Sequence, residues 1–183
     1  MTITVLDAQS ALIVIDLQAG TLGGPTAHSA DEIVARAAEL LAAFRQRERL
    51  VVLATVTGTP AGRSQYGDGA REFPAAFSAL APALNPQPSD VTLSRTTWSA
   101  FAGTNLHALL SERGITQVVL AGIATSFGVE STARDAYDLG YTVALALDAI
   151  TDRDPDAHQH STSRVFPALG QTGSTAEIIA LLG

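Results

Sequence analysis

The sequence lacks cysteine and lysine: its 183 residues include 11 basic residues, and all of them are arginine. The absence of cysteine excludes disulfides, thiolate metal sites and a cysteine nucleophile. The absence of lysine excludes Schiff-base chemistry and a lysine general base. Any catalytic chemistry in this chain must therefore use other side chains.

Basic residues and long apolar segments are also scarce. The 18 acidic and 11 basic residues give a formal net charge of -7, and no basic stripe is present that could follow a phosphate backbone. No segment has the roughly 20 consecutive apolar residues that a membrane span needs, and no positively charged leader precedes the first apolar run. We therefore expect a soluble cytoplasmic protein that acts on a small-molecule substrate, with no nucleic-acid or membrane partner.

Apolar, strand-like runs alternate with amphipathic, helix-like segments along the chain. Strands are predicted at Ala11–Ile15, Leu50–Val56, Val91–Leu93, Val118–Leu120 and Thr142–Leu147. Helices are predicted at Ala30–Glu48, Ala75–Leu80, Thr104–Arg113 and Val129–Tyr137, from Pro155 onward, and at the C-terminus after the capping-box pair Ser174 and Glu177. No linker rich in Pro, Gly or Ser divides the chain. The pattern predicts an α/β fold in one domain, residues 1–183, with a doubly wound, mostly parallel sheet of about six strands.

The stretch Val118–Ala149 is the most informative, because it predicts a strand, a tight loop, a helix and a second strand. Ligands of open α/β sheets bind at the carboxyl ends of the strands, so the loop Ile123–Gly128 is expected to line the crevice. Asp16 follows the first strand and Arg95 follows the third, which directs both toward the same crevice. A desolvated carboxylate needs a compensating cation, and Arg95 is the natural partner of Asp16. The alternative is that Asp16 caps a turn while Arg95 lies on the surface.

Several neighbouring side chains are candidates for binding the substrate. Trp98, Phe101 and Phe127 are expected to wall an apolar pocket around a ring-shaped substrate. Core packing is the alternative for Trp98 and Phe101. Gln18 lies two residues beyond Asp16 and is expected to position either Asp16 or a substrate, the alternative being a plain turn residue.

The connection Thr57–Gly69 is long and rich in Gly, Pro and polar residues. Connections of this length are usually functional or mobile. Arg63 and Tyr66 are therefore candidates for a lid over the pocket, with a solvated loop as the alternative.

The segment Asp152–His160 contains three aspartates and two histidines and superficially resembles a metal site. Asp154 before Pro155 is, however, an ordinary helix start, and acidic residues favour that end of a helix. His158 and His160 are two residues apart and would point from different faces of the helix. We therefore predict no metal and no cofactor.

Three blocks of the sequence resemble the signature blocks of isochorismatase-like hydrolases, the cysteine hydrolase superfamily. They are VIDLQ near the N-terminus, SRTTWSAFAGTNL at Ser94–Leu106 and AGIATSFGVESTARDAYDLGYTVALALDA at Ala121–Ala149. Their order and spacing also match. The resemblance implies a Rossmann-like, three-layer αβα sandwich, a homo-oligomer, and a catalytic set of aspartate, lysine and cysteine. It further implies a non-proline cis peptide at Ile123–Ala124, in a loop whose Ala124, Thr125 and Phe127 face the substrate.

Carried over by position, the catalytic aspartate of the family is Asp16, which is retained. The lysine position, four residues before the serine of SAF, holds Arg95, and the cysteine position, directly before the valine of VEST, holds Gly128. Amidase chemistry through a sulfur nucleophile therefore cannot occur. Ser126 is out of register to replace the cysteine, and no histidine is clearly placed to activate it.

Glycine at this position has its own implication. Isochorismatases of siderophore and phenazine pathways resemble this chain in often having glycine there, and they hydrolyse a vinyl ether that the aspartate protonates. That route requires the pKa of Asp16 to be raised by burial, whereas a neighbouring Arg95 would lower it. The substitution thus favours a basic Asp16, or an Arg95 that binds a substrate carboxylate through two hydrogen bonds.

Two hypotheses follow for the function. In the first, the protein is a small-molecule hydrolase in which Asp16 performs acid/base chemistry and Arg95 orients an anionic group of a vinyl ether or other substrate. In the second, it is an inactive family member that binds a ligand or serves as a structural or regulatory subunit. The departures at Arg95 and Gly128 motivate the second hypothesis, and the retained Asp16 motivates the first.

Overall fold

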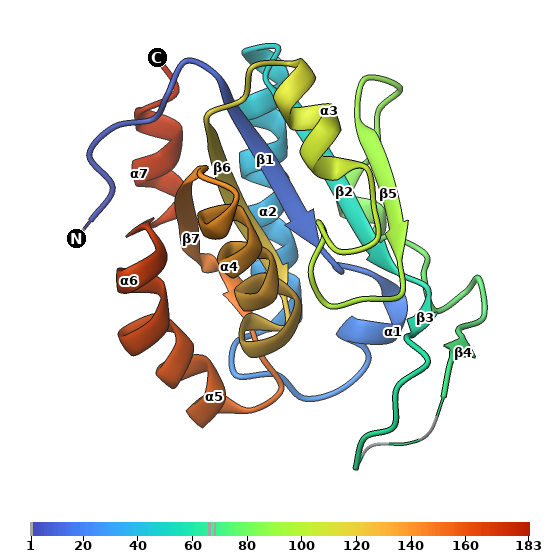
Figure 1. The fold of residues 1–183 in the computed structure, drawn as a ribbon. Coiled ribbons are helices and arrows are strands. Elements are labelled where there is room, and N and C mark those ends of the chain that lie inside the picture. Colours follow the sequence, from blue (N-terminus) through green and yellow to red (C-terminus); the bar gives the residue numbers. More distant parts are fainter. Residues whose placement is uncertain (1, 66, 68) are drawn as a thin grey trace.

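A six-stranded sheet forms the centre of the computed structural model, which describes residues 2–65, 67 and 69–183 (Figure 1). The strands lie in the order β5-β2-β1-β6-β7-β8, and every neighbouring pair is parallel. They are β1 (Ser10–Ile15), β2 (Leu50–Val56), β5 (Val91–Arg95), β6 (Gln117–Ile123), β7 (Thr142–Thr151) and β8 (Gln171–Gly173). The predicted doubly wound, mostly parallel α/β sheet of about six strands is confirmed.

Helices cover both faces of the sheet and complete the predicted three layers (Figure 1). They are α1 (Ala19–Leu22), α2 (Ala30–Gln46), α3 (Leu106–Glu112), α4 (Glu130–Asp138), α5 (Pro155–His160), α6 (Phe166–Leu169) and α7 (Thr175–Ala180), with π-helical turns at Thr125–Val129 and Ser161–Val165 and a 3-10 turn at Pro82–Leu84. No helix in the described part of the chain is both long enough and apolar enough to span a membrane.

The two faces of β1 divide the core into two halves. Leu12 and Val14 pack with α2 and α7, while Ala11, Ile13 and Ile15 pack with α3, α4 and α6. All six residues of β1 are buried, as is typical of a central parallel strand whose two faces are both covered. The residue that follows β1, Asp16, therefore lies directly next to the buried core.

The structure differs from the predicted elements in segments whose backbone groups form hydrogen bonds with distant parts of the chain. The predicted helix Ala75–Leu80 is wrong: this segment forms turns, because the carbonyl groups of Phe77 and Ala79 accept hydrogen bonds from the N–H groups of Gly20 and Ala19. The connection after β2 contains a small antiparallel hairpin of β3 (Gly58–Thr59) and β4 (Arg71–Glu72), which was not predicted. The predicted capping box of Ser174 and Glu177 is confirmed.

Candidate active site

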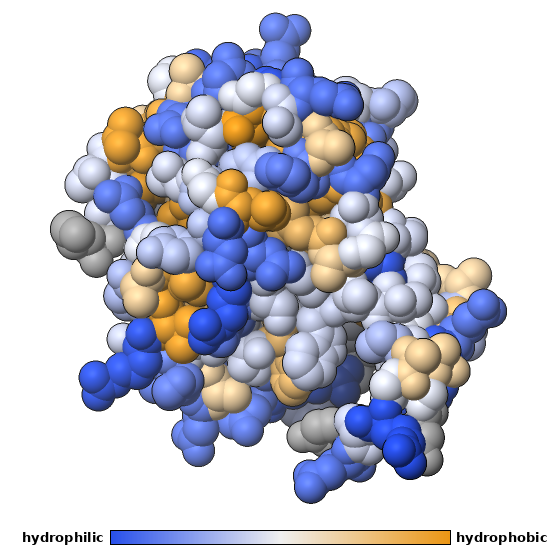
Figure 2. All heavy atoms as spheres, viewed as in Figure 1, coloured by the Kyte–Doolittle hydropathy of each residue, from blue (hydrophilic) through white to orange (hydrophobic). Residues whose placement is uncertain are grey.

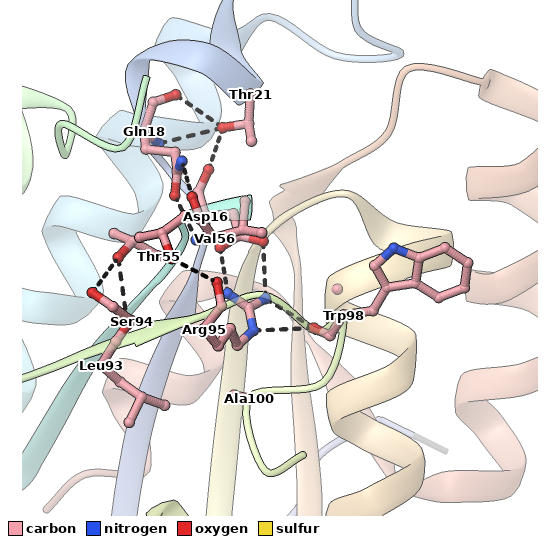
Figure 3. Close-up of polar contacts among 12 residues, drawn as sticks. Asp16, Gln18, Thr21, Thr55, Val56, Leu93, Ser94, Arg95, Trp98 and Ala100 are labelled. Atoms are coloured by element: carbon pink, nitrogen blue, oxygen red, sulfur yellow. Dashed lines mark hydrogen bonds and ion pairs between the residues drawn. The ribbon is translucent and has the colours of Figure 1, made fainter. Parts of the chain in front are cut away.

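Asp16 and Arg95 form a buried ion pair at the carboxyl edge of the sheet (Figure 3). Arg95 Nη1 lies 2.7 Å from Asp16 Oδ1, and Arg95 Nη2 lies 2.9 Å from Asp16 Oδ2. The side chains are 1% and 9% exposed, respectively. β5 and β1 flank β2 in the sheet, so their ends bring the two residues together across the end of β2. The predicted contact is confirmed, and the alternative of a surface Arg95 is wrong.

The backbone at Asp16 makes a sharp turn out of β1. Its φ of 50° lies in the left-handed region, which aspartate tolerates better than most side chains. The turn is held by hydrogen bonds from the Asp16 N–H to the Ala54 carbonyl and from the Gln18 N–H to the Asp16 carbonyl, 2.9 and 2.8 Å long. The Thr21 hydroxyl also donates to the Asp16 carbonyl. These hydrogen bonds fix the turn and thereby the position of the Asp16 carboxylate.

Arg95 has no guanidinium nitrogen left free. Besides its two bonds to Asp16, it donates to the Trp98 carbonyl from Nη2 at 2.8 Å and from Nε at 3.3 Å. Its side chain is almost completely buried and does not line the neighbouring cavities. These hydrogen bonds direct the guanidinium to Asp16 and the backbone, and the expectation that Arg95 orients an anionic group of the substrate stays a prediction.

Burial raises the pKa of Asp16 above its usual value, and the hydrogen bonds and positive charge of Arg95 offset this effect only in part. The expectation that Arg95 would dominate and lower the pKa is not met, because the cost of desolvating the carboxylate is larger. The raised pKa makes a protonated Asp16 more accessible.

Gly128 lies against both members of the ion pair. A Cβ built on it would lie 2.9 Å from Ile15 Cγ2, 3.3 Å from Asp16 Oδ2 and 3.4 Å from Arg95 Nη2. The Ile15 contact is too short for a real Cβ, and the other two are tight. Glycine at 128 therefore fits the site: Ile15, the Asp16 carboxylate and the Arg95 guanidinium together occupy the space that a side chain at 128 would need.

Gly128→Ala is accordingly expected to lower the free energy of unfolding by about 1–3 kcal/mol, the usual cost of overpacking a core by one carbon. Gly62→Ala is the matched control, since nothing lies within 4 Å of a Cβ there. Urea unfolding of both variants measures the difference. Equal stability of Gly128→Ala and wild type would show that the site has room for a side chain.

A cavity of about 550 Å³ opens beside Asp16. Asp16, Gly128, Ala124, Phe127 and Trp98 contribute to its wall, so the structure brings together five of the predicted site residues. The predicted cis peptide at Ile123–Ala124 is present in this wall. A second cavity, of about 900 Å³, shares Trp98 and Phe127 with the first.

The other predicted site residues lie outside the cavity wall. Phe101 is 8% exposed and stacks on Tyr141 in the core, with ring centroids 5.8 Å apart, so the packing alternative describes it. Thr125, in the same loop, is buried, and its hydroxyl lies 2.8 Å from His158 Nδ1. Gln18 is also buried and binds the backbone of Val56 through both amide atoms, each at 2.9 Å (Figure 3).

Asp152 also belongs to the cavity wall, although it is not among the predicted site residues. It is buried, contributes to the wall of the smaller cavity, and accepts hydrogen bonds from the Ser126 N–H at 2.7 Å and hydroxyl at 2.8 Å. It thereby fixes the loop that carries Gly128. Its place directly after β7, at the carboxyl edge of the sheet, was the available signal.

The segment Asp152–His160 does not gather its acidic and histidine side chains around one point. Asp154 caps α5 by accepting hydrogen bonds from the N–H groups of Asp156 and Ala157, and Pro155 follows it, as predicted. Within the described residues, no three His, Cys, Asp or Glu side chains are grouped so that they could hold a metal ion. Of the two residues proposed as a lid, Arg63 lines the larger cavity, and Tyr66 lies outside the described residues.

Comparison with known proteins places this chain in a family. The isochorismatase domain model matches residues 10–177. The chain is 38% identical over 186 residues to an uncharacterized isochorismatase family protein of Escherichia coli O157:H7, YecD, with 94% of this chain and 96% of that protein covered. It is 33% identical over 160 residues to a maleamate amidohydrolase of Pseudomonas putida, with 81% and 75% covered. The structure of an isochorismatase family protein from Burkholderia thailandensis superposes with a TM-score of 0.92 at 39% identity over 99% of each chain. The chain therefore belongs to the isochorismatase family.

Proposed function

We propose that this protein is a small-molecule hydrolase in which Asp16 transfers a proton and no side chain forms a covalent intermediate. The observation that carries the proposal is a buried carboxyl group with a raised pKa in the wall of a cavity of about 550 Å³. A covalent route through a thiol lacks its nucleophile, because the chain has no cysteine. General acid catalysis needs only a positioned proton donor.

Vinyl ether hydrolysis is the reaction that suits these groups best. The protonated carboxyl of Asp16 would give its proton to the terminal carbon of the double bond, which forms an oxocarbenium ion. Water adds to that ion, the resulting hemiketal breaks down to a ketone and an alcohol, and the proton released from the water returns to Asp16. Arg95 would stabilise the Asp16 carboxylate formed in the first step through its two hydrogen bonds.

A second candidate is a family member that binds a ligand without hydrolysing it. Each carboxylate oxygen of Asp16 already accepts a hydrogen bond from Arg95, and this closed pair is the observation that favours it. Protonating Asp16 must weaken one of those bonds. The two candidates differ in whether any turnover depends on Asp16.

The test is incubation of the purified protein with isochorismate, with pyruvate release followed through a coupled dehydrogenase. Wild type is expected to release pyruvate, and Asp16→Asn is expected not to. Release that is equal in both proteins would contradict the assigned role of Asp16. The absence of release from wild type would exclude isochorismate as the vinyl ether substrate.

The pH dependence of the reaction distinguishes an acidic from a basic Asp16. A general acid must hold its proton, so kcat/KM is expected to fall as the pH rises through the raised pKa of Asp16. A general base would give the opposite limb, with kcat/KM rising through the same pKa. A profile of kcat/KM against pH, measured for wild type and Arg95→Lys, shows which limb is present.

A further inference from the structure

Three arginines gather in the larger cavity of an otherwise acidic protein. Arg63, Arg71 and Arg153 line this space of about 900 Å³, and the described residues of its wall include no aspartate or glutamate. The whole chain, by contrast, has a formal net charge of -7. A cavity lined by one sign of charge concentrates ligands of the opposite sign. The larger cavity is therefore suited to an anionic group.

The charges of these arginines are not neutralised within the described residues. None of the three takes part in an ion pair there. Arg153 donates from Nη2 to the carbonyl groups of Gly20 and Thr21, at 3.2 and 3.3 Å, which fixes the guanidinium without cancelling its charge. Strongly hydrophilic side chains also gather over the β3–β4 segment on the face shown in Figure 2.

Arg71 is held by the β3–β4 hairpin. It pairs with Thr59 in the hairpin register, and its N–H donates to the Thr59 hydroxyl at 3.1 Å. The backbone is thus anchored, and Arg71 lines the cavity wall. A guanidinium of this kind binds carboxylate or phosphate oxygens through parallel hydrogen bonds.

An aromatic pair lies where the two cavities meet. Trp98 and Phe127 line both cavities, and their rings contact edge to face with centroids 4.9 Å apart. The side chains stay open to solvent at 60% and 38% exposure. Exposed aromatic rings at the junction are suited to the flat, unsaturated part of a ligand that reaches from one cavity into the other.

The two cavities differ in electrostatic character. The smaller one has the carboxyl groups of Asp16 and Asp152 in its wall together with Arg153. The described wall of the larger one has Arg63, Arg71 and the same Arg153, and no carboxyl group. A ligand that spans both is therefore expected to direct an anionic end toward the larger cavity, with the hydrolysed bond beside Asp16.

We propose that the substrate carries a carboxylate or phosphate at the end away from the hydrolysed bond, and that Arg71 and Arg153 bind this group while Trp98 and Phe127 contact the unsaturated body. The placement of the hydrolysed bond beside Asp16 rests on the proposed hydrolase function. The anion subsite does not, and binding measurements alone can test it.

Trp98 is the only tryptophan of the chain and reports directly on the junction. Its fluorescence is expected to change in a saturable manner on titration with benzoate and with phenyl phosphate. Benzamide has the same ring without the charge, and it is expected to bind at least about tenfold more weakly, since a hydrogen bond to a charged group contributes about 1.5–3 kcal/mol. The benzoate and phenyl phosphate titrations together show which anion is preferred.

Arg71→Gln and Arg153→Gln are each expected to weaken benzoate or phenyl phosphate binding about tenfold or more, and to leave benzamide unchanged. Arg113→Gln is the matched control, because Arg113 is exposed and lines neither cavity. Equal binding of benzoate and benzamide, or equal loss in all three variants, would overturn the proposal.

The experiments distinguish failure of the anion subsite from failure of the proposed hydrolase function. Arginine-dependent anion binding without Asp16-dependent turnover would keep the subsite and remove the reaction. Turnover that depends on Asp16 but is insensitive to Arg71→Gln and Arg153→Gln would keep the reaction and remove the subsite. The fluorescence titration of Asp16→Asn completes the design, because this variant is expected to bind benzoate while lacking turnover.

Discussion

Arg95→Met is expected to lower the free energy of unfolding by about 3–5 kcal/mol, the cost of leaving one partner of a buried ion pair alone. Arg95 supplies both hydrogen bonds that the Asp16 carboxylate receives from a cation, and the two side chains are 1% and 9% exposed. The methionine side chain fills much of the arginine volume, so the loss reports mainly on the unpaired carboxylate. Urea unfolding at neutral pH measures it.

Arg36→Met provides the contrast for this measurement. Arg36 pairs with Glu39 on the surface, where both side chains are 49% exposed, and such pairs contribute about 0–1 kcal/mol. A loss from Arg95→Met as small as that from Arg36→Met would contradict the importance of the buried pair. The double variant Asp16→Leu with Arg95→Met removes both charges and is expected to recover much of the stability.

The pH dependence of the Arg95→Met defect has a definite sign. Burial already raises the pKa of Asp16, and loss of Arg95 removes two of the three effects that lower it, so the pKa rises further. The folded variant then keeps its proton at pH values where the unfolded chain has lost it, and unfolding releases a proton. Stability therefore falls as the pH rises from the unfolded pKa to the folded pKa. The deficit relative to wild type is expected to be larger at about pH 7 than at about pH 5.

The ion pair could be predicted from the sequence because topology and desolvation agree. Asp16 follows a fully buried strand and Arg95 ends another parallel strand, so both reach the same edge of the sheet. What the sequence left open was the balance of effects on Asp16. Burial and the arginine act in opposite directions on the pKa, and only the three-dimensional packing decides which is larger.

Other residues were misassigned because their roles depend on packing rather than on pattern. Phe101 follows Trp98 in the same motif, yet one ring lies in the core and the other is 60% exposed. A residue's position in a loop does not specify which way its side chain points. Asp152 was interpreted as part of an acidic, histidine-containing cluster, although its contact is the loop of Ser126, 26 positions earlier in the chain. Arg71 and Arg153 of the larger cavity could not be identified from the sequence either; the hairpin that carries Arg71 has only two residues in each strand.

Asp16→Asn is expected to reduce kcat by about 10²- to 10⁴-fold, the usual contribution of a positioned acid or base. Asparagine keeps the shape of the side chain and one oxygen for Arg95, but it has no acidic proton to give to a substrate. Its amide nitrogen must also face an arginine donor or turn away from it, so some stability is lost as well. Steady-state kinetics on the folded variant measures the effect on kcat.

Asp90→Asn separates this loss of activity from the loss of an ion pair. Asp90 is 1% exposed at its side chain and pairs with Arg45 at 2.7 Å, in a chemistry close to that of Asp16 and Arg95. It lines neither of the two cavities near Asp16. Asp90→Asn is therefore expected to lower stability while leaving kcat within about twofold of wild type. If both variants lose activity alike, the effect of Asp16→Asn is one of folding. If only Asp16→Asn loses activity, its carboxyl group acts in the reaction itself.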